Sequence, residues 1–146
     1  MANRENLTKL STELRSGKYP QGRKALRTNH DSIRTNDDGY CCLGVGCDIS
    51  GLGKWENRGR WYYSVPAGDA TSTIDYANRL DEDMSSSILP KAVAKWLGID
   101  MYGTFKLDGH DNVGEFDLAM LNDGNFTFDQ IADIIDSPVV IFDPND

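Results

Sequence analysis

Long hydrophobic runs are absent from this chain of 146 residues. No stretch approaches the roughly 18 apolar residues that a transmembrane helix needs, so we expect no membrane-spanning segment. The N-terminal segment Met-Ala-Asn-Arg-Glu-Asn-Leu is polar overall and lacks the apolar stretch of a signal peptide. Cysteine is scarce as well, and three residues, two of them adjacent, are a poor basis for a disulfide scaffold. These absences favour a reduced, cytoplasmic setting.

Lysine and arginine are missing from residues 111–146, which carry nine acids and a net charge of −9. Residues 1–34 hold eight basic against three acidic residues, a net of +5, in a chain whose total is −8. The helical segments between Leu118 and Ile135 superficially resemble the first half of a DNA-binding helix-turn-helix motif, but Pro138 stands where the recognition helix would follow. The acidic segment would also be repelled by a phosphate backbone, so DNA binding is not expected. Two interpretations of the pattern remain: an acidic surface that keeps the protein in solution, or a bipolar molecule with a basic patch for an anion and an acidic face for a basic partner.

The spacing of apolar residues predicts several short helices. Gly17 and Gly98 stand where glycine commonly follows a helix, and Asn122–Gly124 stops a third one. The segment 41–52 fits either a strand or a helix, and we favour a short buried helix although two interior glycines weaken it. Each of the other helical segments is predicted from an apolar stripe. Their residues are, in chain order, Leu7, Leu10 and Leu14; Val93, Trp96 and Leu97, with Pro90 at the first helical position; Phe116, Ala119 and Met120; and Ile131, Ile134 and Ile135, after a capping box of Thr127 and Gln130.

Strand-forming residues on both sides of a turn predict a hairpin over Lys54 to Val65. Shorter strands are expected near 103–107 and 139–142. Residues 66–87 are rich in small polar residues and are expected to form a surface loop or insertion, and 143–146 a tail. We therefore expect one α+β domain over residues 1–146, with three or four short helices packed on a small antiparallel sheet or hairpin.

All three cysteines fall within seven positions, Cys41 to Cys47. A zinc site completed by His30 or His110 is disfavoured, because adjacent cysteines rarely both reach one ion and paired Cys-x2-Cys spacing is absent. The local sequence Tyr40-Cys-Cys-Leu-Gly is similar to that of the cysteine-bearing helix of papain-like and NlpC-type peptidases, which makes Cys42 a candidate nucleophile. His110 is its candidate base, oriented by Asp108 or Asp111. The alternative is a run of buried, unreactive cysteines.

Basic and aromatic residues occur together in two segments, 18–27 and 55–63. Arginines beside aromatic rings can bind a phosphate and stack on a base, although the same composition suits a protein–protein hot spot or a core whose arginines are solvated. The candidate ligand-binding residues are Arg23, Arg58, Arg60 and Trp61, supported by Lys18, Lys24, Arg27, Trp55, Tyr62 and Tyr63. We expect the functional surface on this side and not on the acidic C-terminal segment.

Five blocks follow one another along the chain: Ser16-Gly-Lys-Tyr-x-Gln-Gly-Arg, Tyr40-Cys-Cys-Leu-Gly-Val-x-Cys-Asp, Trp55, Leu89-Pro-x-x-Val-x-x-Trp-Leu-Gly, and Leu118-Ala-x-Leu-Asn-Asp-x-x-x-x-Phe-x-x-Ile-Ala-Asp. Together they resemble a family of small proteins encoded by tailed bacteriophages, for which no activity is established. The segment 66–87 departs from that family. The resemblance implies an accessory protein made inside an infected bacterium.

The leading interpretation is a binding protein of the host cytoplasm that engages a host protein or sequesters an anionic, nucleotide-like small molecule. The alternative is a cysteine-dependent hydrolase or transferase that uses Cys42 and His110. No cofactor or metal is expected, and the oligomeric state is left open.

Overall fold

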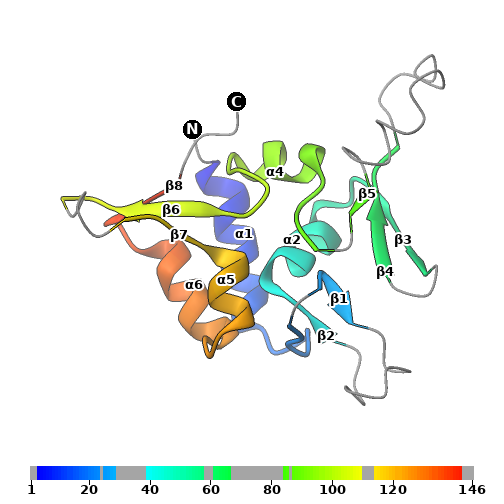
Figure 1. Cartoon of the computed structure of the whole chain (residues 1–146), viewed down its shortest axis with the longest axis horizontal. Helices are drawn as coiled ribbons and strands as arrows, with labels where there is room; N and C mark the ends of the chain where they lie inside the picture. The colour runs from blue at the N-terminus through cyan, green and yellow to red at the C-terminus, as the bar shows by residue number, and fades with distance from the viewer. Residues whose placement is uncertain are drawn as a thin grey trace.

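The computed structural model describes residues 3–23, 25–28, 39–57, 61–66, 84–85, 87–109 and 114–142. The described residues contain five helices and three small antiparallel sheets (Figure 1). The helices are α1 (Arg4–Arg15), α2 (Cys42–Ser50), α4 (Lys91–Leu97), α5 (Leu118–Asp123) and α6 (Phe128–Asp136). The strands are β1 (Arg27–Thr28), β2 (Gly39–Tyr40), β3 (Lys54–Asn57), β4 (Trp61–Ser64), β5 (Met84–Ser85), β6 (Thr104–Leu107), β7 (Phe116–Asp117) and β8 (Val140–Phe142).

The expected single α+β domain is confirmed, with five helices in the described part where three or four were predicted. The sheets run in the order β1–β2, β3–β4–β5 and β7–β6–β8. Figure 1 shows the helices between the sheet of β6 to β8 on one flank and the sheet of β3 to β5 on the other. Within the described residues, no helix is long and apolar enough to cross a membrane.

The core forms where α1 packs on α6, with α2 and α4 beside α1. The stripe of Leu7, Leu10 and Leu14 is buried against this core, as are Ile131 and Ile135 of α6. Burying a leucine or isoleucine side chain contributes about 1.5–3 kcal/mol relative to leaving it exposed. The two helices at the ends of the sequence therefore form the stable centre of the fold.

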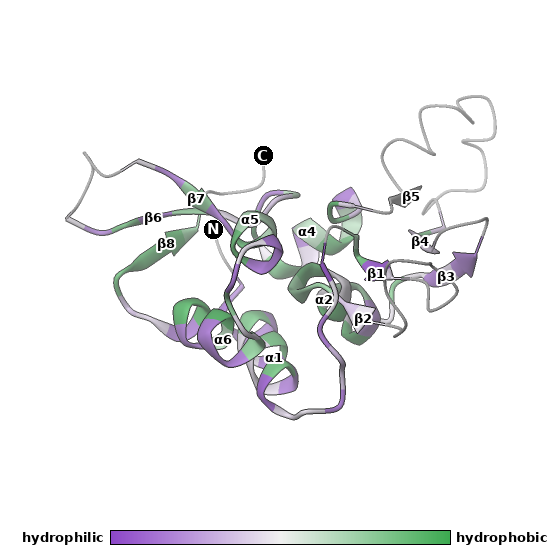
Figure 2. Cartoon of the chain, turned by 60° about the horizontal axis from the view of Figure 1, so that its bottom comes forward, coloured by the Kyte–Doolittle hydropathy of each residue, from purple (hydrophilic) through white to green (hydrophobic). Residues whose placement is uncertain are grey.

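The cysteine segment is a helix, as favoured from the sequence, and most of α2 is hydrophobic (Figure 2). The Sγ of Cys41 caps its first turn by accepting a hydrogen bond of 3.3 Å from the Gly44 amide. A Cβ at Gly44 would lie 1.8 Å from the carbonyl oxygen of Leu26. The glycine therefore permits the chain just before β1 to lie directly on α2, and this contact offsets its weak helix propensity.

The basic start of the chain contacts its acidic end. Arg4 donates two hydrogen bonds of 2.8 Å to the carbonyl of Ile135, the next-to-last residue of α6. Arg15 binds Asp136 at 2.6 Å and Asp133 at 2.8 Å. Part of the charge asymmetry in the sequence is therefore satisfied inside the molecule, across the α1–α6 interface.

Most local predictions are confirmed, and two are corrected. The capping box of α6 is present in both directions, 2.9 Å and 3.2 Å between Thr127 and Gln130. Pro90 takes the N-cap position one residue before α4, not the first helical position. Phe116 lies in β7 and not on a helical stripe, because Asp117 caps α5 and starts it at Leu118.

The predicted hairpin is confirmed, since β3 pairs antiparallel with β4 from Lys54 opposite Ser64 to Asn57 opposite Trp61. The strands expected near 103–107 and 139–142 are β6 and β8. The segment expected as a loop over 66–87 includes β5, which adds to the edge of β4. The remainder of that segment and the tail 143–146 lie outside the described residues, apart from residues 66 and 87.

Candidate ligand-binding site

The guanidinium of Arg27 lies among three aromatic rings. Its central carbon is 3.9 Å from the ring centre of Trp61, 5.2 Å from that of Tyr40 and 5.6 Å from that of Trp55. Cations within about 6 Å of a ring centre are attracted by the electron-rich face. We call these four residues the Arg27 cluster; all of them are half-buried.

Strand pairing brings the cluster together. Arg27 of β1 is directly opposite Tyr40 of β2, and β1 lies against β4. Trp55 of β3 is opposite Tyr63 of β4, two positions from Trp61. Because side chains alternate along a strand, Trp55, Trp61 and Tyr63 share one face of the hairpin. The two basic–aromatic segments of the sequence therefore meet at Arg27.

A row of edge-to-face rings supports the cluster. The centroid distances are 5.1 Å from Tyr19 to Tyr40, 5.8 Å from Tyr40 to Trp55 and 4.9 Å from Trp55 to Tyr63. The carboxylate of Asp48 accepts from the Tyr19 hydroxyl at 2.5 Å and from Trp55 Nε1 at 3.1 Å. Burial and this hydrogen bond raise the pKa of Tyr19 above its ordinary value, so the phenol stays protonated and holds its place.

Two N–H donors of the cluster have no acceptor among the described residues. Arg27 Nε and Trp61 Nε1 are the buried side-chain polar atoms without a hydrogen-bond partner in the part of the chain that the structure describes. No ion pair joins Arg27 to a carboxylate of a described residue, in contrast to Arg15 with its two aspartates. A buried donor without an acceptor costs about 1–3 kcal/mol. The cluster is thus a cationic, donor-rich site.

The structure separates two of the residues proposed from the sequence. Arg23 Nε donates to the carbonyl of Gly124 at 2.9 Å, in the loop between the acidic helices α5 and α6. Trp61 stacks on Arg27 instead. Arg58 and Arg60 lie outside the described residues, as does Lys24. Tyr40 was missed as a cluster residue, since only the pairing of β1 with β2 brings it opposite Arg27. Tyr19 and Asp48 were missed too, because they reach the cluster only through tertiary contacts with Tyr40 and Trp55.

The Cys42 thiol is buried in the core. It is fully buried, donates to the Leu118 carbonyl at 3.6 Å, and its amide donates to Asn122 Oδ1 at 3.2 Å. Burial raises the pKa of Cys42 well above its ordinary value, and the pKa of Cys47 likewise. A thiolate nucleophile is therefore disfavoured here. The proposed base His110 lies outside the described residues, as does Asp111, one of its two candidate partners; Asp108, the other, is described and follows β6.

Cys41, not Cys42, borders a hollow. This hollow has a volume of about 270 Å³ and includes Tyr102, Met120, Asp117 and Asp123 in its lining. Burial raises the pKa of Cys41 to about 12, so its thiol is unreactive near neutral pH. Among the described residues, no group of three or more histidine, cysteine or acidic side chains is placed to hold a metal ion.

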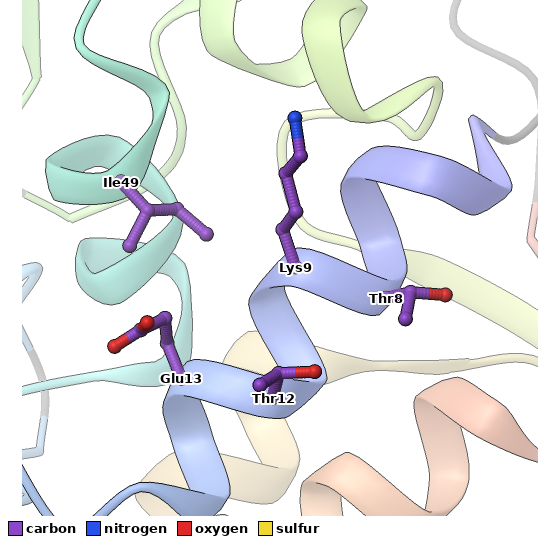
Figure 3. A pocket seen from close by; sticks show the side chains of 5 residues that line it. All are labelled: Thr8, Lys9, Thr12, Glu13 and Ile49. Atoms are coloured by element: carbon purple, nitrogen blue, oxygen red, sulfur yellow. The ribbon is translucent and has the colours of Figure 1, made fainter.

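A second hollow of about 350 Å³ lies between α1 and α2. Lys9 and Glu13 lie on α1 beside Ile49 of α2, with Thr8 and Thr12 completing the lining (Figure 3). Lys9 lies 4.0 Å from Glu5, and Glu13 lies 3.7 Å from Lys18. Its charges are thus already compensated, which leaves the Arg27 cluster as the stronger candidate for an anion.

The family model described as Domain of unknown function (DUF8296) matches residues 3–139. The chain belongs to this family. No curated protein and no solved structure gives a significant match. The matched range includes the whole Arg27 cluster and the α1–α6 core and ends just before β8, so the core helices and the candidate site both lie within the family domain.

Proposed function

We propose that this family member is a phage-encoded accessory protein of the host cytoplasm that binds an anionic, nucleotide-like small molecule through the Arg27 cluster. The observation that carries the proposal is the position of the Arg27 guanidinium, stacked among three rings without an ion-pair partner among the described carboxylates. The phage origin and the location follow from the sequence resemblance alone.

The chemistry of the cluster suits such a ligand. A guanidinium presents a rigid fork of donors that matches phosphate and carboxylate oxygens. Indole and phenol rings stack on heteroaromatic bases, and each stacked base is worth about 1–3 kcal/mol. A half-buried site strengthens both interactions because water screens them less. A cation and ring faces in one place therefore favour a ligand that carries both an anion and a ring.

A nucleic-acid polymer is a poorer fit than a free nucleotide. The chain has a formal net charge of −8, and Arg15, Arg4 and Arg23 are engaged in intramolecular contacts. Polymer binding depends on neutralising several phosphates with lysine and arginine. The hydrolase alternative loses support because the Cys42 thiol is buried and protonated.

The proposal is tested by calorimetric titration of the full chain with nucleoside mono-, di- and triphosphates and cyclic nucleotides. We expect at least one to bind, and Arg27→Gln to weaken it about tenfold, the loss of one charge-assisted contact. Lys106→Gln is the matched control, because it removes one exposed positive charge from β6, in the opposite sheet. Absence of binding across the panel, or equal losses in both variants, would overturn the proposal.

A further inference from the structure

The Arg27 guanidinium occupies the face of Trp61. Its central carbon lies 3.9 Å from the Trp61 ring centre, which is van der Waals contact for stacked flat groups. Tyr40 and Trp55 lie more than 1 Å farther away, at 5.2 Å and 5.6 Å. A planar cation of the protein thus takes the position in which the ring of a ligand would stack on the indole.

We propose that Arg27 is a displaceable occupant of the Trp61 face. A ligand with a planar aromatic ring and an attached anionic group places its ring on Trp61, and the guanidinium turns aside to bind the anionic group. This inference rests on the proposed function and adds the ligand class and the rearrangement that accompanies binding.

The two donors without acceptors support displacement. In the stacked arrangement Arg27 Nε and Trp61 Nε1 are buried and have no acceptor in the described part of the chain. Because a buried donor without an acceptor destabilises the state that contains it, a ligand whose oxygens accept these hydrogens favours the rearranged state. A ligand that interacts more strongly with the displaced arrangement of Arg27 than with the stacked one shifts the equilibrium toward displacement.

The movement is confined to one side chain. Arg27 lies on the two-residue strand β1, which pairs with β2 in a sheet of its own. Its ring contacts are made with β2, β3 and β4, and not with the α1–α6 core. Four rotatable side-chain bonds let an arginine leave a ring while its backbone stays paired. Displacement therefore requires no change in the helices.

The test compares adenosine monophosphate with adenosine on the wild type, Arg27→Ala and the Lys106→Ala control. The wild type and the control prefer the monophosphate. Arg27→Ala binds the monophosphate about tenfold more weakly, because the anion has lost its partner. The same variant binds adenosine several-fold more tightly, because the base no longer has to displace the guanidinium from the Trp61 ring. A cation–ring contact of this kind changes a binding constant by up to about tenfold.

The outcomes separate the two claims. If the wild type binds no nucleotide, the proposed function fails and displacement fails with it. If the wild type prefers the monophosphate but Arg27→Ala binds adenosine equally or more weakly, displacement alone is overturned. Should Arg27→Ala unfold, Arg27→Lys keeps the charge and loses the planar stack, so it should still prefer the monophosphate and should bind adenosine more tightly than the wild type does. Adenosine binding that is equal or weaker would again overturn displacement.

A measurement without ligand gives a second readout. Removing Arg27 uncovers the Trp61 ring, so acrylamide quenches the tryptophan fluorescence of folded Arg27→Ala more strongly than that of the wild type. An unchanged quenching constant would mean that the guanidinium does not cover the indole, and displacement would be overturned.

Discussion

At the scale of single residues, two arginines of the N-terminal segment have opposite surroundings. Arg15 binds two carboxylates, Asp133 and Asp136, across the α1–α6 interface. Arg27 binds the faces of three rings. The first arrangement satisfies the charge and stabilises the fold, while the second leaves a cation able to bind an external anion. Sequence alone did not distinguish them, because each arginine lies in a similarly basic stretch.

The Asp136 carboxylate makes stability depend on pH. Burial alone would raise its pKa, but hydrogen bonds from Arg15 and Ser11 and the nearby positive charges outweigh burial and lower it. The unfolded chain therefore takes up this proton at higher pH than the folded one does. The stabilisation is present above the pKa of the unfolded state and is lost as the pH falls through the folded pKa.

We expect Asp136→Asn to reduce the free energy of unfolding at pH 7 by about 0.5–1 kcal/mol, since the ion pair is partly exposed and screened. The difference from the wild type should shrink in strongly acidic solution, where Asp136 is protonated in both states. Urea unfolding of the wild type and the variant at pH 7 and in strongly acidic solution measures this difference in the free energy of unfolding. A difference that stays constant with pH would show that the amide disturbs packing and not a charge interaction.

At the scale of elements, the start of α6 was readable from the sequence, whereas the starts of α4 and α5 needed correction and the buried segment 41–52 was ambiguous. The capping box of α6 follows from residues three positions apart and is present as expected. The segment 41–52 fitted both helix and strand, because its residues from Cys41 to Cys47 are all buried and give no periodic pattern. Its outcome depends on Leu26, whose carbonyl lies on Gly44, a contact that local spacing cannot reveal.

The capping box gives a direct prediction for α6. Thr127→Ala removes the side-chain oxygen that accepts from the Gln130 amide at 3.2 Å, and should lower the free energy of unfolding by about 1 kcal/mol. Thr12→Ala, at an exposed position within α1, is the matched control and should be neutral or slightly stabilising. Denaturant melts compare them. Equal stability of the two variants would mean that the cap contributes nothing.

The close approach of Leu26 to α2 predicts a large effect at one glycine. Gly44→Ala places a Cβ 1.8 Å from the Leu26 carbonyl oxygen and should destabilise the protein by at least about 2 kcal/mol through forced backbone movement. Gly46→Ala, two positions farther along the same helix, meets only the ends of side chains, the nearest being that of Leu97 at 3.3 Å. It should cost far less. Thermal unfolding that ranks the two variants in the opposite order would contradict this packing.

At the scale of the whole molecule, helices from both ends of the sequence pack with α2 and α4 in the core, and the candidate site lies on strands β1 to β4. The helices of the first and last quarter could be predicted because their apolar stripes are regular, as with Leu7, Leu10 and Leu14. The site was predicted only in part. Its aromatic strands and basic residues were identified, but which arginine meets Trp61 depends on the pairing of β1 with β2.

The central claim is that an anionic ligand binds at the Arg27 cluster, and the side-chain N–H signals of tryptophan and arginine test it most directly. The chain has three tryptophans: Trp55 and Trp61 belong to the cluster, and Trp96 on α4 is an internal control. In ¹H–¹⁵N spectra recorded during titration with adenosine monophosphate, we expect the signals of Trp61 Nε1–H and Arg27 Nε–H to move and that of Trp96 to stay. Movement of Trp96 alone, or no movement of the Arg27 and Trp61 signals at saturating ligand, would contradict the assignment of this site.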